Sequence, residues 1–216
     1  MIRKIVLPGS LVGDKSKLPG KGTFREGENI YSSRLGILEE KGKYVNVIPL
    51  SGVYIPNVGD TIIGVVEEVY RNGWIIDIKS PYSAFLSIEN SPWEMGYGET
   101  SKYLKEKDII IGIISNIDEA KNIDVSMKDK QCRKIEDGIV IDIQPSKVPR
   151  VIGKKGSMLS TIKRYTGCWI FVGQNGRIWL KGEDEKVNLA VEAIKKIEKE
   201  AHTFGLTERI IKMLGG

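Results

Sequence analysis

The hexapeptide VIGKKG, residues 151–156, organises the C-terminal third of the chain. A β-rich run at 138–143 and a short helical turn at 147–152 lead into it, and a helix is predicted over 157–165 with Ser157 as its N-cap. A glycine at each end lets the backbone turn sharply and approach a sugar-phosphate chain without a Cβ in the way. Two lysines and the free N–H groups of the next helix make this loop a candidate phosphate-binding site.

The residues after this loop predict the rest of a small α+β domain. Two strands, at 168–172 and 177–180, flank an Asn-Gly pair, which is typical of a type I′ hairpin turn with positive φ at both central residues. Asp184 is predicted to cap a long helix whose apolar residues recur at intervals of three and four. The expected order is strand, helix, helix, strand, strand, helix, and a last short helix is predicted at 207–214.

Positive charge is concentrated around the glycine-rich loop. The formal net charge of the chain is +5, with +3 in residues 1–60, −4 in residues 61–130 and +6 in residues 131–216. No carboxylate occurs between Asp142 and Glu183, whereas eight lysines and arginines lie there. Such a window favours a polyanionic partner, because a nearby carboxylate would repel phosphate. A solvated basic surface is the alternative interpretation.

The middle of the chain has the pattern of a small β-barrel. Asn72-Gly73 separates two β-rich runs and predicts a hairpin of type I′. Five short strands within about 70 residues fit a closed barrel of the oligonucleotide-binding type. The residues before it are divided by Pro and Gly into short pieces, which indicates a small all-β module at 1–57. The barrel strands are predicted at 62–70, 74–78, 84–88, 108–116 and 122–127.

Residues 136–202 resemble a KH domain with the order βααββα, and the GKKG loop matches the signature loop of that family. The resemblance implies that the loop holds about four nucleotides of single-stranded RNA by their backbone. Ile152, Leu159 and Ile162 are candidates for the floor of the groove or for helix packing. Of the three aromatic residues on the strands, Trp169, Phe171 and Trp179, at least two are expected to pack rather than stack on bases. The implied RNA-binding residues of this domain are Arg150, Ile152, Gly153, Lys154, Lys155, Gly156, Lys163 and Arg164.

Residues 58–129 resemble an S1-type RNA-binding barrel, with one departure from that family. The two positions around the first hairpin at which the family usually carries base-stacking aromatics hold Asn72 and Ile75. A stacking contribution of about 1–3 kcal/mol per base is therefore in doubt, and the acidic segment is expected to guide RNA weakly. The substitutes considered for RNA contact are Arg71, Trp74, Lys79, Tyr82 and Phe85, of which Arg71 and Lys79 are assigned as RNA-binding.

Three N-terminal motifs, VLPG at 6–9, PGKGT at 19–23 and IPLSGVYIP at 48–56, extend the resemblance to nearly the whole chain. Together with the S1 and KH regions they resemble the RNA-binding cap subunits of the archaeal exosome. The resemblance implies docking on a hexameric RNase PH-like ring, recruitment of single-stranded RNA and delivery of that RNA to the pore of the ring. It leaves open whether other cap subunits share the ring. Docking is assigned to Pro8, Gly9, Tyr54 and Pro56, with partner-free β turns as the alternative.

The predicted domains are the N-terminal module at 1–57, the S1 domain at 58–130, the KH domain at 136–205 and a C-terminal tail at 206–216. Cys132 and Cys168 form no CxxC pair and His202 is the only histidine, which leaves no zinc cluster and no histidine-based triad. We therefore expect a protein that is not an enzyme and that has no cofactor and no metal. The longest apolar stretch is far shorter than a membrane helix, so a cytoplasmic location is expected.

Two other functions fit parts of the sequence. A transcription-elongation type RNA-binding factor also places an S1 barrel before KH modules, but that group carries tandem KH copies. An independent nuclease is disfavoured because acidic pairs such as Asp118-Glu119 have no second cluster to complete a two-metal site. The stretch GSLVGDKS at 9–16 is rejected as a phosphate-binding P-loop because its lysine is wrongly spaced and no long helix follows.

Overall fold

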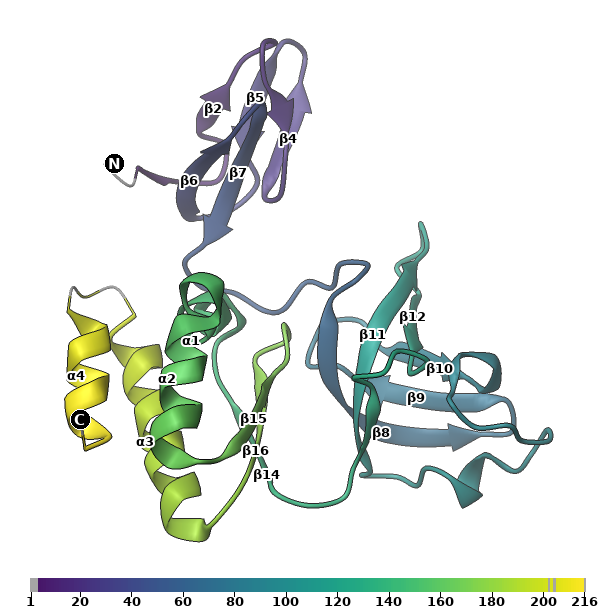
Figure 1. Ribbon diagram of the computed structural model, residues 1–216. Helices are drawn as coiled ribbons and strands as arrows, with labels where there is room; N and C mark the ends of the chain where they lie inside the picture. Colours follow the sequence, from purple (N-terminus) through teal and green to yellow (C-terminus); the bar gives the residue numbers. More distant parts are fainter. Residues whose placement is uncertain (1–3, 202, 204, 216) are drawn as a thin grey trace. The chain divides into compact units, whose positions relative to one another are not determined.

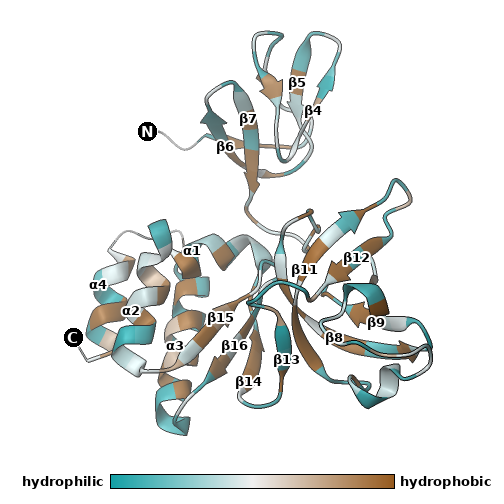
Figure 2. Cartoon of the chain, turned by 45° about the vertical axis from the view of Figure 1, so that its right-hand side comes forward, coloured by the Kyte–Doolittle hydropathy of each residue, from teal (hydrophilic) through white to brown (hydrophobic). Residues whose placement is uncertain are grey.

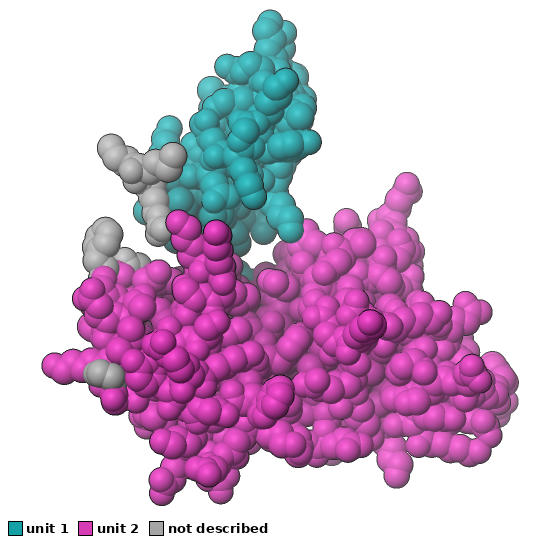
Figure 3. All heavy atoms as spheres, viewed as in Figure 1, with its two compact units in different colours: residues 1–52 teal, residues 53–216 magenta. Residues whose placement is uncertain are grey.

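The computed structural model describes residues 4–201, 203 and 205–215, and the chain divides into two compact units, residues 1–52 and 53–216 (Figure 3). We call them the N-terminal unit and the C-terminal unit. None of the helices in the described residues has the length and apolarity of a membrane span.

The described part of the N-terminal unit consists of short strands and turns, which confirms the all-β prediction. Its two small sheets have the strand orders β1-β6-β7-β3 and β2-β5-β4. Five apolar side chains, Val6, Val12, Ile30, Val45 and Val47, form its core. The strands are β1 (Ile5–Val6), β2 (Leu11–Gly13), β3 (Leu18–Pro19), β4 (Thr23–Glu26), β5 (Asn29–Ser32), β6 (Gly36–Lys41) and β7 (Tyr44–Pro49).

The first part of the C-terminal unit is the predicted five-stranded barrel. The strand order is β12-β10-β9-β8-β11, and pairing of β12 with β11 closes the barrel. A further strand, β13 (Arg133–Ile135), pairs with β11 and was not expected from the sequence. The strands are β8 (Thr61–Tyr70), β9 (Gly73–Asp77), β10 (Ala84–Ser87), β11 (Ile109–Ile117) and β12 (Ile123–Ser126), with short 3₁₀ turns η1 (Ile88–Asn90) and η2 (Thr100–Lys102).

The second part has the βααββα order of a KH domain. Its sheet has the order β14-β16-β15; all of its helices lie on one face and the barrel lies on the other (Figure 1). The terminal helix α4 packs on the apolar core of this domain through Leu206 and Ile210, and Leu214, directly after the helix, joins the same core. The elements are β14 (Ile139–Asp142), η3 (Pro145–Lys147), α1 (Val148–Ile152), η4 (Lys154–Gly156), α2 (Ser157–Thr166), β15 (Trp169–Val172), β16 (Arg177–Lys181), α3 (Asp184–Lys199) and α4 (Leu206–Met213).

The local chemistry of the turns and caps differs from the prediction. Both hairpins form, but neither asparagine has positive φ, so the type I′ assignments were wrong. In the β15–β16 turn only the final glycine, Gly176, has positive φ (83°), and its N–H donates to the Gly173 carbonyl over 3.1 Å. The N-caps of α2 and α3 are Gly156 and Glu183, each one residue earlier than predicted, and neither helix has a side-chain cap.

Apolar side chains join the barrel to the outer face of the KH sheet. Ile63 and Ile111 of the barrel form a buried cluster with Trp179, and Ile135 and Phe171 pack against it. Figure 2 shows hydrophobic residues along the facing strands β8, β11 and β16. Because this contact is apolar and largely closed to water, it holds the two folds together as one unit.

Candidate nucleic-acid interface

The two glycines of the signature loop are required for different reasons. Gly153 ends α1 with φ 76°, and a Cβ built there would lie 2.7 Å from both the backbone nitrogen and the Cβ of Met158. Gly156 has φ 79° but faces open space, so only its backbone conformation favours glycine. Lys155, between them, also has positive φ (52°). The loop is therefore a tight turn that presents its backbone and its two lysines outward.

The loop and the following helix carry exposed positive charge. Lys154, Lys155, Lys163 and Arg164 are all exposed, and in the described residues none of them forms a salt bridge. The Arg164 guanidinium lies 5.0 Å from the centre of the Tyr165 ring. These cations are thus available to phosphate groups.

The predicted groove residues divide into partly exposed and buried ones. Ile152 and Leu159 are half-buried at the edge of the KH core, where they can contact a ligand. Ile162 is fully buried, so its role is helix packing. Arg150 is half-buried, and within the described residues its Nε atom has no hydrogen-bond partner. Because this Nε atom is closed to solvent, it does not by itself show that Arg150 contacts RNA, and the RNA-binding role of Arg150 stays a prediction.

The aromatic residues of the KH sheet confirm the packing prediction for two of three. Trp179 is 6% exposed and Phe171 is half-buried, and both lie in the contact with the barrel. Trp179 also donates its indole N–H to the Asp137 carbonyl over 2.7 Å. Trp169, by contrast, is 71% exposed.

The barrel substitutes for stacking aromatics are placed less favourably. Trp74 is fully buried in the barrel core and donates its indole N–H to the Leu104 carbonyl over 3.2 Å, so it is unavailable to bases. Phe85 is half-buried, and its ring lies so close to Gly73 that a Cβ there would be 2.6 Å from Cζ. Arg71 and Tyr82 are exposed at loops and can face RNA.

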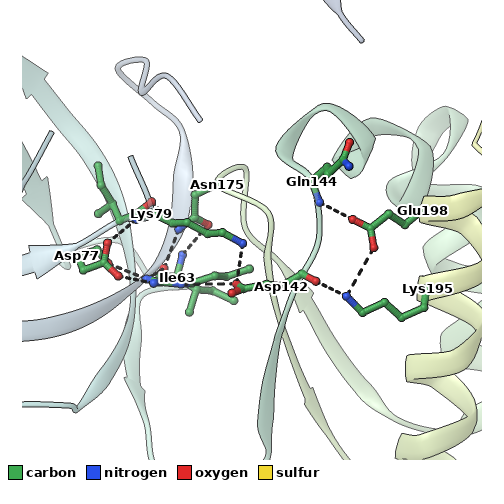
Figure 4. Close-up of polar contacts among 10 residues, drawn as sticks. Ile63, Asp77, Lys79, Asp142, Gln144, Asn175, Lys195 and Glu198 are labelled. Atoms are coloured by element: carbon green, nitrogen blue, oxygen red, sulfur yellow. Dashed lines mark hydrogen bonds and ion pairs between the residues drawn. The ribbon is translucent and has the colours of Figure 1, made fainter. Parts of the chain in front are cut away.

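Lys79 belongs to the junction between the barrel and the KH domain. Its ammonium group forms an ion pair with Asp142 at 3.1 Å (Figure 4). Arg177 forms another ion pair with Asp77. On the KH side, Lys195 donates to the Asp142 carbonyl. The RNA-binding assignment of Lys79 is therefore weakened, because its charge is already matched by a carboxylate.

Asn175 is the residue of this junction that sequence analysis missed. It is fully buried, and its side-chain amide donates to the carbonyls of Ile63 (2.8 Å) and Ile78 (3.0 Å) in the barrel. Its Oδ1 accepts the Ile63 N–H at 3.3 Å (Figure 4). The Asn-Gly pair had pointed only to a turn, and a turn residue is usually exposed.

The four residues predicted to dock on a partner lie in different environments. Pro8 and Gly9 are exposed in the N-terminal unit. Tyr54 and Pro56 are buried in the C-terminal unit, and the Tyr54 hydroxyl donates to Asp60 over 2.8 Å. Burial, together with the neighbouring Asp60 carboxylate, raises the pKa of Tyr54. Of these four residues, only Pro8 and Gly9 therefore offer surface to a partner, and the docking itself stays a prediction.

In the described part of the chain, no group of three or more His, Cys, Asp or Glu side chains is placed to hold a metal ion. The chemistry that these surfaces support is recognition of a polyanion through backbone, lysine and arginine donors.

Known proteins match all three parts of the chain. Family models match residues 3–51 as the exosome RNA binding protein RRP4 N-terminal domain, 53–98 as the RRP4 S1 domain and 138–186 as a KH domain. The exosome complex component Rrp4 of Picrophilus torridus is 42% identical, over 100% of this chain and 95% of its own length. The chain belongs to the Rrp4 family. Rrp4 of Methanosarcina mazei is 44% identical over 99% of this chain and 82% of its own length.

A solved structure supports the same assignment. The crystal structure of a candidate exosome complex RNA-binding protein is 38% identical to this Rrp4-family chain, with a TM-score of 0.70, and the match covers 76% of this chain and 95% of the other. These findings confirm the resemblance and the multidomain order of N-terminal β module, S1 and KH. They disfavour a transcription-elongation factor, because the N-terminal and S1 matches are to Rrp4 models.

Proposed function

We propose that this chain is a non-catalytic RNA-binding cap subunit of a cytoplasmic exosome. It recruits single-stranded RNA and guides it to the pore of a hexameric ring of RNase PH-like subunits, which degrade RNA by phosphorolysis. The observation that carries the proposal is the exposed GKKG loop, which lies in a stretch of sequence without Asp or Glu, in a chain of the Rrp4 family.

The KH surface supplies the grip on RNA. The loop offers backbone N–H groups and the ammonium groups of Lys154 and Lys155, and Lys163 and Arg164 extend the charge along α2. Phosphate contacts of this kind hold a strand without selecting its sequence. The barrel, whose segment 61–130 has net charge −4, contacts the same strand weakly through Arg71 and neighbouring loops.

The N-terminal unit supplies attachment to the ring. The Pro8-Gly9 turn is flanked by three exposed apolar side chains, Ile5, Leu7 and Leu11, which are 62%, 63% and 57% exposed. Clustered exposed apolar residues are typical of a protein interface. We therefore assign docking to this turn rather than to Tyr54 and Pro56.

RNA binding is tested by fluorescence anisotropy with labelled single-stranded RNA. The double variant Lys154→Asp/Lys155→Asp is expected to keep its fold and to lose affinity on the order of 10- to 100-fold, since two phosphate contacts become repulsive. The matched control, Lys41→Asp/Lys43→Asp, makes the same charge change at exposed positions of the N-terminal unit and should bind normally. Equal affinity of both variants would place the RNA site elsewhere.

Ring attachment is tested by co-purification of the full chain and of residues 53–216 with a reconstituted ring. The truncated chain keeps the complete C-terminal unit, so it should bind RNA and fail to attach. Attachment without the N-terminal unit would overturn the docking assignment. Incubating the chain alone with RNA, phosphate and Mg²⁺ should leave the RNA intact, and shortening would refute a non-catalytic role.

A further inference from the structure

A surface cleft lies on the opposite side of the KH sheet from the helices. It has a volume of about 340 Å³ and is bordered by β13, the following residues Glu136 and Asp137, and the side chains of Trp169, Trp179 and Lys181. A volume of this size is comparable with small-ligand pockets of roughly 300–1,000 Å³. The cleft therefore has room for a small planar group.

Strand alternation explains why Trp169 faces this cleft. Ile170 is buried in the KH core beneath the helices, so Trp169 and Phe171 point to the other face of the sheet. The barrel covers Phe171 and Trp179 but leaves Trp169 71% exposed. The large indole of Trp169 is exposed to water at the edge strand β15. Packing an apolar or aromatic partner against it would be energetically favourable.

The charges of the cleft favour stacking over simple phosphate attraction. Lys181 is paired with Asp137 at 2.5 Å and Lys134 with Asp108 at 2.6 Å, so both ammonium groups are already matched. Arg133 is exposed, its guanidinium lies 5.0 Å from the centre of the Trp179 ring, and it forms no salt bridge within the described residues. An exposed tryptophan and an arginine without a carboxylate partner therefore line the same cleft, and side chains of these two kinds are used to stack single-stranded bases.

The same surface continues along the barrel. A second cleft, of about 500 Å³, lies against β13 and shares Arg133, Lys134 and Glu136 with the first. Trp93 and Tyr103 line it, with ring centres 5.4 Å apart. Aromatic and basic side chains thus follow one another from the KH sheet to the barrel.

We propose that Trp169 stacks on a base of single-stranded RNA, with Arg133 beside it, at a contact outside the GKKG groove. This inference rests on the proposed function, and it adds a position at which the strand is held between the KH domain and the barrel. The group that occupies the cleft is the uncharged base rather than a phosphate, because Glu136 borders the cleft and both of its lysines are paired with carboxylates.

The test compares RNA tetranucleotides with oligonucleotides of about 12 residues, each titrated against the full chain. Trp169→Ala should weaken binding of the longer RNA by about 5- to 150-fold and leave the tetranucleotide unaffected, because the loop alone holds about four nucleotides. Trp169→Phe should restore most of the affinity. The salt dependence of the longer RNA should keep its slope, since stacking releases no counterions.

Tyr44→Ala serves as the control, since it removes a 52% exposed aromatic residue from the N-terminal unit and should change neither affinity. Wild-type binding of both RNAs with no effect of Trp169→Ala overturns this inference and leaves the proposed function intact. Failure of the wild-type chain to bind either RNA overturns both. Loss of ring attachment in Trp169→Ala, with RNA affinity unchanged, would show that the cleft is a protein interface instead.

Discussion

Replacing Asn175 by alanine should loosen the contact between the barrel and the KH domain. The fully buried side chain makes three hydrogen bonds to Ile63 and Ile78, at 2.8, 3.0 and 3.3 Å. At about 1 kcal/mol of net stabilisation each, their loss should lower the free energy of unfolding by about 3 kcal/mol. With a urea m-value of about 2 kcal/mol/M, the unfolding midpoint should fall by about 1.5 M.

The measurement is urea unfolding followed by tryptophan fluorescence and by circular dichroism. Gln174→Ala is the matched control, because Gln174 is exposed in the same turn and its backbone bond to the Thr61 carbonyl is retained. The Asn175→Ala transition should also separate into two steps, since the barrel and the KH domain lose their shared buried contact. A midpoint shift no larger than that of Gln174→Ala would refute the reasoning.

Three further outcomes are expected. The logarithm of RNA affinity should fall with the logarithm of salt concentration at a slope of about −3, from about −0.7 per phosphate for four contacts, and a flat dependence would contradict a phosphate grip. Gly153→Ala should lower the melting temperature more than Gly156→Ala does, because only the first places a Cβ 2.7 Å from the Met158 backbone, and equal losses would show that φ alone matters. Burial acts to raise the pKa of Asp108, but hydrogen bonds from Lys134 and the Lys105 backbone outweigh it, so the pKa is lowered. The stability that this ionised carboxylate provides is present above its unfolded pKa of about 4 and is lost as pH falls through the lower folded value. Asp108→Asn should therefore reduce the dependence of the free energy of unfolding on pH below about pH 4. An unchanged dependence would exclude the ion pair with Lys134 as its cause.

Much of the architecture was accessible from local patterns. The order of elements around VIGKKG and the hairpins of the barrel were predicted correctly, because periodicity and glycine placement report directly on backbone conformation. The turn types were wrong, since an Asn-Gly pair permits positive φ at asparagine without requiring it. The cap positions were wrong by one residue, which is the usual uncertainty at helix ends.

The environment of individual side chains was harder to predict. Trp74, a candidate for base stacking, alternates with Ile76 and Ile78, and all three are buried in the barrel core. This alternation in the sequence indicates packing rather than stacking. Asn175 of the KH domain bonds to Ile63 of the barrel, which is 112 residues away in the sequence. Lys79 of the barrel pairs with Asp142 of the KH domain. No local sequence pattern encodes contacts of this kind. The site residues that local sequence identifies best are those of the loop, where glycine, lysine and missing carboxylates occur together.

The buried amide of Asn175 and the apolar cluster of Ile63, Ile111 and Trp179 also determine how the affinity for RNA depends on the length of the strand. They keep the GKKG loop and the barrel surface at a constant separation, so the KH domain and the barrel act as one rigid body rather than as two flexibly linked domains. A strand too short to bridge that separation gains from one surface only, and each nucleotide added below the threshold contributes little. Affinity should therefore rise in a step once the strand reaches the second surface, and RNA ends that have been trimmed below that length would be released.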